Sequence, residues 1–147
     1  MAKRSIKSSP SDTEKVYWGA DVPMRVIRRF ARQVAERFDP EKIILFGSHA
    51  YGTPHEDSDV DILVVMPARH QGSKAGRIRW LVPAPFPMDL IVRTPENLWR
   101  RLAEGDLFHT EITSKGKVLY EKRYRGGQGR GRLPRRAKSR PKETSSP

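Results

Sequence analysis

The residues most able to do chemistry lie between Gly47 and Asp61, where the chain reads Gly-Ser-x3-Gly-x5-Ser-Asp-x-Asp. This segment contains four acids within six residues, Glu56, Asp57, Asp59 and Asp61. Carboxylates this close repel one another by roughly 1 kcal/mol per pair in water, and by more where water is excluded. A hard divalent cation would relieve the repulsion, so the segment predicts a metal site.

Two apolar runs position these residues, one at 43–46 before the motif and one at 62–65 after it. Each has the length and composition of a buried strand. Asp59 and Asp61 are two residues apart, and such side chains share one face of a strand. A third apolar strand at 88–92 contains Asp89. If it lies beside the strand at 59–66, about 4.8 Å away, Asp89 joins the same face.

Three such carboxylates could hold two divalent ions, the arrangement used to transfer a nucleotidyl group. Magnesium fits best, since it prefers hard oxygen ligands and accepts phosphates and water in its coordination shell. Gly47 would let the backbone approach a phosphate, and Ser48 could contribute its hydroxyl and a helix N-terminal amide. Metal ligation is therefore predicted for Asp59, Asp61 and Asp89, and phosphate contact for Gly47 and Ser48.

Further elements surround this centre. An amphipathic helix runs from an N-cap at Asp21, with Pro23 in its first turn, to Asp39-Pro40. Residues 67–79 show no clean period and predict a flexible connection, a candidate lid, with one helical turn at 77–81. Thr94 caps a helix that starts with Pro95 and ends at Gly105. A second helical stretch at 106–114 precedes a strand at 117–121.

Composition indicates one domain with polar ends. The 147 residues carry a net charge of +12, yet residues 11–120 hold 16 bases and 15 acids, so the excess belongs to the termini. We expect a polar arm over 1–20, whose residues 16–18 could dock on the core, a domain over 21–122 and a basic disordered tail over 123–147. The chain has no cysteine, signal-like stretch or membrane-length apolar run, which favours a soluble cytoplasmic protein.

The spaced motif, with Asp89 downstream, resembles the signature of the polymerase-β-like nucleotidyltransferase superfamily. More narrowly, the chain over about residues 23–121 resembles the minimal nucleotidyltransferases, or MNT proteins, many of which pair with a HEPN-domain protein in bacterial toxin–antitoxin modules. Segments 85–96 and 116–121 share this likeness. The resemblance implies an α/β (α+β) nucleotidyltransferase fold with a mixed central sheet flanked by helices. It also implies ATP, magnesium and metal-ligand roles for Asp59, Asp61 and Asp89.

The resemblance further implies an enzyme that transfers AMP from ATP to a hydroxyl acceptor, with a tyrosine of a HEPN-type toxin as the preferred acceptor. Two alternatives stay open. One is a non-catalytic module that neutralises its partner by contact, and the other is nucleotidyl transfer to RNA or to a small molecule such as an aminoglycoside. The basic tail could bind nucleic acid.

Other residues in the region have simpler interpretations. Glu56 and Asp57 are expected to be turn formers, and His49 and His55 lack the paired spacing of zinc ligands. His49 also stands where many antitoxin-type members have an arginine, so a phosphate contact at that position is not predicted. Four arginines on the first helix are expected to form a solvated face, with contact to a nucleic acid or an acidic partner as the alternative: Arg25, Arg28, Arg29 and Arg32.

Overall fold

The computed structural model describes residues 15–123. Their elements, in chain order, are the 3-10 turn η1 (Gly19–Asp21), α1 (Met24–Phe38), β2 (Lys42–Phe46), α2 (Ser48–Tyr51), β3 (Val60–Val65), α3 (Gln71–Leu81), β4 (Met88–Arg93), α4 (Pro95–Ala103), α5 (Leu107–Lys115) and β5 (Lys117–Glu121). Residues 124–147 of the predicted tail and the first fourteen residues of the predicted arm lie outside this range.

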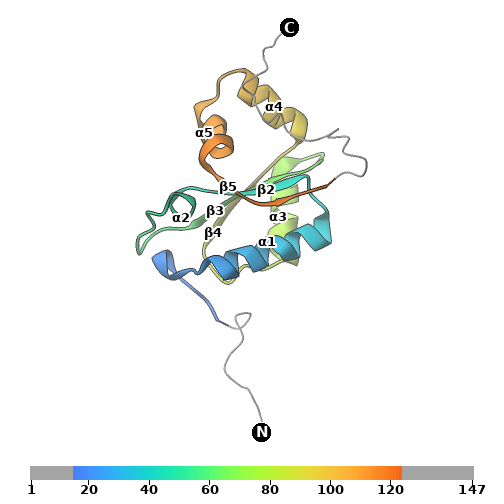
Figure 1. The fold of residues 1–147 in the computed structure, drawn as a ribbon. Helices are drawn as coiled ribbons and strands as arrows, with labels where there is room; N and C mark the ends of the chain where they lie inside the picture. The colour runs from blue at the N-terminus through green and yellow to red at the C-terminus, as the bar shows by residue number, and fades with distance from the viewer. Residues whose placement is uncertain (1–14, 124–147) are drawn as a thin grey trace.

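The four strands form one sheet in the order β4-β3-β2-β5. Strand β2 pairs antiparallel with both β3 and β5, whereas β3 and β4 run parallel. Helices cover both faces: α1 and α3 lie below the sheet and α4 and α5 above it (Figure 1). The predicted α/β fold with a mixed central sheet is therefore confirmed.

Alternation along the strands divides the core into two layers. Ile62 and Val64 of β3 face the larger cluster with α1 and α3, while Leu63 and Val65 face the smaller cluster under α4 and α5. Leu98, Leu102 and Ile112 supply the helical side of the smaller cluster. This face matters for function because Asp61 precedes Leu63 by two residues and so shares its side of the sheet.

Most predicted boundaries agree with the structure to within one or two residues. Strand β2 begins one residue before the apolar run at 43–46 and ends with it, and β5 begins and ends where expected. Thr94 caps α4 by accepting a hydrogen bond from the backbone N–H of Asn97 at 3.1 Å. The predicted cap at Asp21 is wrong, because Asp21 ends η1 and Pro23 occupies the N-cap of α1. Tyr17 docks on the core, and its N–H donates to the Pro85 carbonyl at 2.8 Å, while Val16 and Trp18 are exposed.

The predicted flexible connection over residues 67–79 is also wrong. Residues 71–79 belong to α3, an eleven-residue helix from Gln71 to Leu81 that packs against β4 and includes the predicted turn at 77–81, so this part is not a flexible lid. Ile78 is the fully buried anchor, and the Gln71 side chain accepts a hydrogen bond from the backbone N–H of Thr94 at 2.9 Å. Because so little of α3 is buried, its sequence lacks the amphipathic period by which a helix is recognised. Within residues 15–123, none of the helices is long and apolar enough to cross a membrane.

Candidate active site

The acids predicted on separate strands lie side by side. Asp61 of β3 is in register with Asp89 of the parallel strand β4, and on its other side it is in register with Phe46 of β2. These three residues form the first row of the upper face, beyond the second row of Leu63, Ile91 and Ile44 that α4 and α5 cover. The first row is therefore at the open end of the face, where Asp89 is exposed and Asp61 is partly exposed.

Electrostatics show that the three carboxylates interact. Burial, followed by the nearby charges of Asp89 and Asp59, raises the pKa of Asp61 from the ordinary 3.8 to about 6. Asp59 is exposed and lies one residue before β3, so it continues the face that Asp61 begins. Among the described residues, no ion pair or hydrogen bond reaches these three side chains. We call Asp59, Asp61 and Asp89 the acidic site; its charge has no internal compensation.

Gly47 brings the backbone directly over this site. Its φ of 76° is in the left-handed region, and a Cβ atom at this position would overlap the Oδ2 atom of Asp61. Glycine is therefore required on both counts. Ser48 follows as the first residue of the single-turn helix α2 and is partly exposed, and the N-cap position belongs to Gly47. The Gly-Ser pair thus lies against Asp61 at the open end of the sheet.

The donor chemistry of the acidic site suits a divalent cation. Three carboxylates offer hard oxygen ligands. Burial raises the pKa of Asp61 most, and the charges of Asp89 and Asp59, which a cation would offset, raise it too. Within residues 15–123, no group of three or more His, Asp or Glu side chains is gathered closely enough to form a ready metal cage. The residues present fit magnesium by type and charge, and ligation by the three aspartates stays a prediction.

His49 has a role that the sequence did not indicate. Its side chain is buried, and desolvation lowers its pKa, although the backbones of Gly19 and Ser58 oppose that shift. Its Nε2 atom has no hydrogen-bond partner among the described residues. His49 therefore packs against the backbones of Gly19 and Ser58, and Ser58 belongs to the loop that leads to Asp59. In that loop Glu56 and Asp57 form an exposed turn, as predicted.

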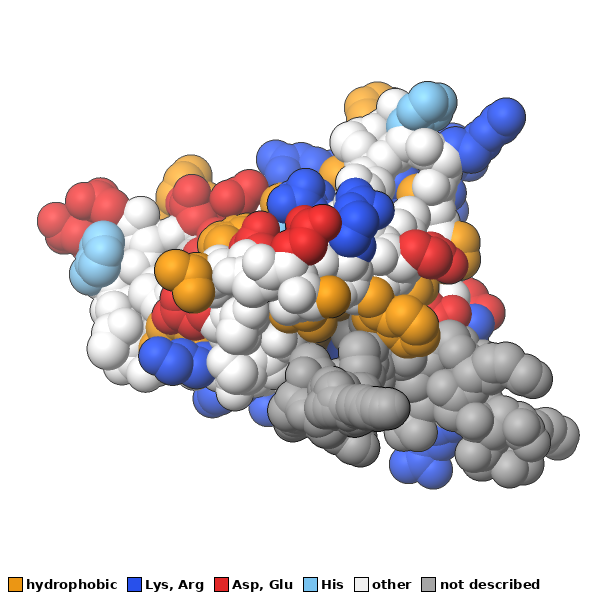
Figure 2. Space-filling view, turned by 90° about the horizontal axis from the view of Figure 1, so that it is seen from above, with side chains coloured by type: hydrophobic (Ala, Val, Ile, Leu, Met, Phe, Trp, Pro, Cys, Tyr) orange, Lys and Arg blue, Asp and Glu red, His pale blue; other side chains and the backbone are white. Residues whose placement is uncertain are grey.

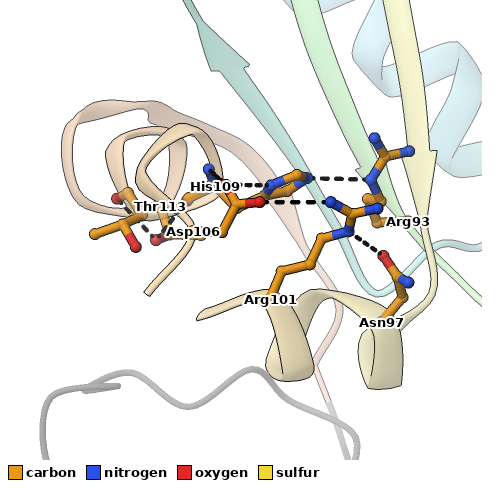
Figure 3. A network of polar contacts seen from close by, with 7 residues as sticks. Arg93, Asn97, Arg101, Asp106, His109 and Thr113 are labelled. Atoms are coloured by element: carbon orange, nitrogen blue, oxygen red, sulfur yellow. Dashed lines mark hydrogen bonds and ion pairs between the residues drawn. The ribbon is translucent and has the colours of Figure 1, made fainter. Parts of the chain in front are cut away.

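A second charged cluster lies on the same face of the sheet, at the opposite end of β4 (Figure 3). Arg93 Nε donates to His109 Nε2 at 3.1 Å, so the proton on the imidazole is at Nδ1 and is donated to Asp106 Oδ1 at 3.0 Å. Arg101 joins through Asp106 Oδ2 at 3.4 Å and through Asn97 Oδ1 at 2.9 Å. We call these five residues the α5 clamp, since they tie α4 and α5 to β4.

The arginine face of α1 lies on the other side of the sheet. Arg28 and Arg32 border a hollow of about 410 Å³ between α1 and β5, together with Glu36 and Tyr120. Because α1 packs on the lower cluster, these arginines do not reach the acidic site. On the face seen in Figure 2, the α4 and α5 side, acidic and basic side chains are interspersed, so this surface is not uniformly basic.

Comparison with known proteins decides the family. The model of the nucleotidyltransferase domain matches residues 27–119, which include the Gly-Ser pair and all three aspartates. The chain belongs to the nucleotidyltransferase domain family. No curated protein gives a significant match.

Two solved structures have a similar fold. A putative nucleotidyltransferase from Sulfolobus solfataricus is 16% identical, with a TM-score of 0.45, and the match covers 67% of this chain and 80% of that chain. A mutant of the toxin-antitoxin MntA-HpeT is 17% identical, with a TM-score of 0.44, and covers 69% of this chain and 76% of that chain. The match to the family model, over residues 27–119, begins in α1 and ends in β5.

Proposed function

We propose that this nucleotidyltransferase domain transfers the AMP moiety of ATP to a protein hydroxyl, and that the acceptor is a tyrosine of a HEPN-type toxin. The observation that carries the transfer reaction is the register of Asp61 with Asp89 beneath Gly47. At this point carboxylates without a basic partner lie against the backbone of Gly47. Such an arrangement suits the binding of a metal-bound triphosphate better than a structural role. The toxin acceptor rests on the sequence resemblance to MNT proteins.

In the proposed reaction the acceptor oxygen forms a bond to the α-phosphorus while the bond from that phosphorus to pyrophosphate breaks. Magnesium, held by Asp59, Asp61 and Asp89, would supply charge neutralisation for the phosphates when bound. Asp89 is exposed at the start of β4 and can accept the proton that the acceptor hydroxyl loses. Gly47 allows the phosphates to approach the backbone, and Ser48 offers its hydroxyl to them.

Burial around the site supports this division of roles. Asp61 is flanked by Phe46 and lies over the covered second row, so it is the most desolvated acid of the three. Asp59 and Asp89 are exposed and can meet ligands that arrive from solvent. Asp61 is therefore held against the buried Phe46 on one side, and the exposed Asp89 on its other side leaves room for a large acceptor to approach.

The test uses the full-length chain, magnesium, a HEPN-type partner and ATP labelled at either the α- or the γ-phosphate. We expect α-label on a partner tyrosine, no γ-label, and loss of the signal with EDTA or with replacement of that tyrosine by phenylalanine. Asp61→Asn should remove the label and leave partner binding intact. Label from the γ-phosphate would indicate a kinase.

A further outcome would replace the proposal altogether. If the wild type and Asp61→Asn silence the partner equally well with no label transferred, the domain acts by contact and not by catalysis. If label goes to RNA or to an aminoglycoside in parallel assays and never to the partner, the acceptor assignment is wrong while nucleotidyl transfer stands.

A further inference from the structure

Phe108 is an aromatic side chain whose exposure the fold does not explain. It lies in the first turn of α5 and is 51% exposed, whereas Ile112 and His109 on the same helix are buried. An isolated large apolar side chain on a protein surface is common and needs no functional explanation. Phe108 differs because of where it lies relative to the acidic site.

The ring borders the first row of the sheet. The centroid of Phe108 is 5.7 Å from that of Phe46, with the two planes at 87°. Phe46 is in register with Asp61 and directly precedes Gly47. Phe46 therefore contacts Phe108, and the next two residues, Gly47 and Ser48, are the predicted phosphate contacts.

The α5 clamp holds Phe108 in place. Its ring also meets the ring of His109 edge-on, at 5.1 Å and 89°. His109 is 2% exposed and is fixed by its bonds to Asp106 and Arg93. Two edge-to-face contacts thus orient Phe108 while about half of its surface still faces solvent. A rigid, half-exposed ring beside a charged site is preorganised to bind a flat ligand.

We propose that Phe108 is the stacking platform for the base of the bound nucleotide, an inference that rests on the proposed function. A nucleotide anchored by its phosphates at Gly47 and Ser48 extends its base away from the acids, and any base offers a π-face to an aromatic ring. Stacking of this kind is sequence-tolerant. Phe108 therefore strengthens nucleotide binding and discriminates little between adenine and guanine.

The experiment compares a nucleotide with its base-free counterpart. The full-length chain is titrated in magnesium with α,β-methylene ATP, α,β-methylene GTP and inorganic tripolyphosphate. Phe108→Ala and Phe108→Leu should weaken binding of both nucleotides about 5- to 100-fold and leave tripolyphosphate unchanged. Phe108→Trp should keep nucleotide binding at or above the wild-type level. Phe108→Leu preserves apolar bulk, so it separates stacking from stability.

Tyr51 provides the matched comparison, since it is a 37% exposed aromatic at the end of α2, three residues after Ser48. Tyr51→Leu should change nucleotide affinity less than twofold. The inference is overturned if Tyr51→Leu weakens the nucleotides and Phe108→Leu does not, or if Phe108→Leu weakens tripolyphosphate equally. An effect confined to the KM of the acceptor would instead make Phe108 an acceptor contact. Wild-type protein that binds none of the three ligands would refute the proposed function itself.

Discussion

The acidic site and the α5 clamp lie on one face of the same sheet. The charges of the α5 clamp are paired with one another, whereas those of the acidic site are not. In the α5 clamp, hydrogen bonds from the backbone and side chain of His109 lower the pKa of Asp106 to about 2. In the acidic site, burial and neighbouring acids raise the pKa of Asp61 to about 6. A structural cluster pairs its charges internally, whereas a site for a charged ligand leaves them unpaired. This difference supports the proposal that the acidic site, and not the α5 clamp, binds a charged ligand.

The largest expected effect comes from removing a carboxylate of the acidic site. Asp59→Asn, Asp61→Asn or Asp89→Asn should each reduce nucleotidyl transfer by at least about 100-fold, because each removes a proposed ligand of the cation that would neutralise the reacting phosphates. Far-ultraviolet circular dichroism should be unchanged. The measurement is the initial rate of α-label transfer at saturating ATP.

Asp57→Asn is the matched control, since Asp57 is an exposed acid in the turn before the same strand. It should retain nearly full activity. Equal losses in Asp57→Asn and Asp61→Asn would mean that local negative charge in general, and not the geometry of the acidic site, supports the reaction.

The α5 clamp should show the reverse behaviour, a loss of stability. His109 is buried, and His109→Leu removes the acceptor of the partly buried Arg93 Nε–H, which is left without a hydrogen bond. For that unpaired donor we expect a decrease of about 2 kcal/mol in the free energy of unfolding. Urea denaturation monitored by circular dichroism measures it.

Thr110→Ala, at the exposed neighbouring position, serves as the control and should change the free energy of unfolding by less than about 0.5 kcal/mol. If His109→Leu is no more destabilising than Thr110→Ala, the α5 clamp does not hold α4 and α5 in place. The preorganisation of Phe108 by the α5 clamp would then also be wrong.

The acidic site could be predicted from the sequence because its residues obey local rules. Period-two alternation placed Asp59 and Asp61 on one face, and apolar runs marked the strands on either side. To predict that Asp89 lies in the same row, it was enough to assume that β3 and β4 are neighbours. The pairing of the two strands confirms that assumption. Gly47 was predicted for close approach, and its contact with Asp61 explains that glycine more directly than a phosphate does.

The α5 clamp and α3 could not be predicted in the same way. Arg93 and His109 are sixteen residues apart and meet only because α5 folds back onto β4. A spacing of Asp106 and His109 by three residues was a usable signal for a capped helix start, but not for the contact with Arg93. Helix α3 owes its stability to Ile78 and to packing on β4, which tertiary structure supplies and propensity does not.

The smallest expected effect is the dependence of stability on the protonation of Asp61. It tests most directly whether the charge of Asp61 is unpaired. Because the pKa of Asp61 is raised in the folded state, the native protein favours the protonated carboxyl. The contribution of the protonated Asp61 to the free energy of unfolding is fully present below pH 3.8, and it is lost as the pH rises through about 6. Asp61→Asn removes this dependence and should therefore be more stable than wild type at pH 7, by about 1–2 kcal/mol after allowance for solvent screening.

The measurement is the difference in unfolding free energy between wild type and Asp61→Asn, by urea denaturation without metal at several pH values from 4 to 7.5. Taking the difference cancels the titration of acids outside the site, including Asp106. It should be near zero at pH 4, grow through pH 6 and then level off. Magnesium at pH 7 should stabilise wild type more than the variant, because bound cation offsets the ionised Asp61. A variant that is less stable than wild type at pH 7 without metal would instead identify Asp61 as a structural acid whose partner stabilises the fold, and the contrast with the α5 clamp would be lost.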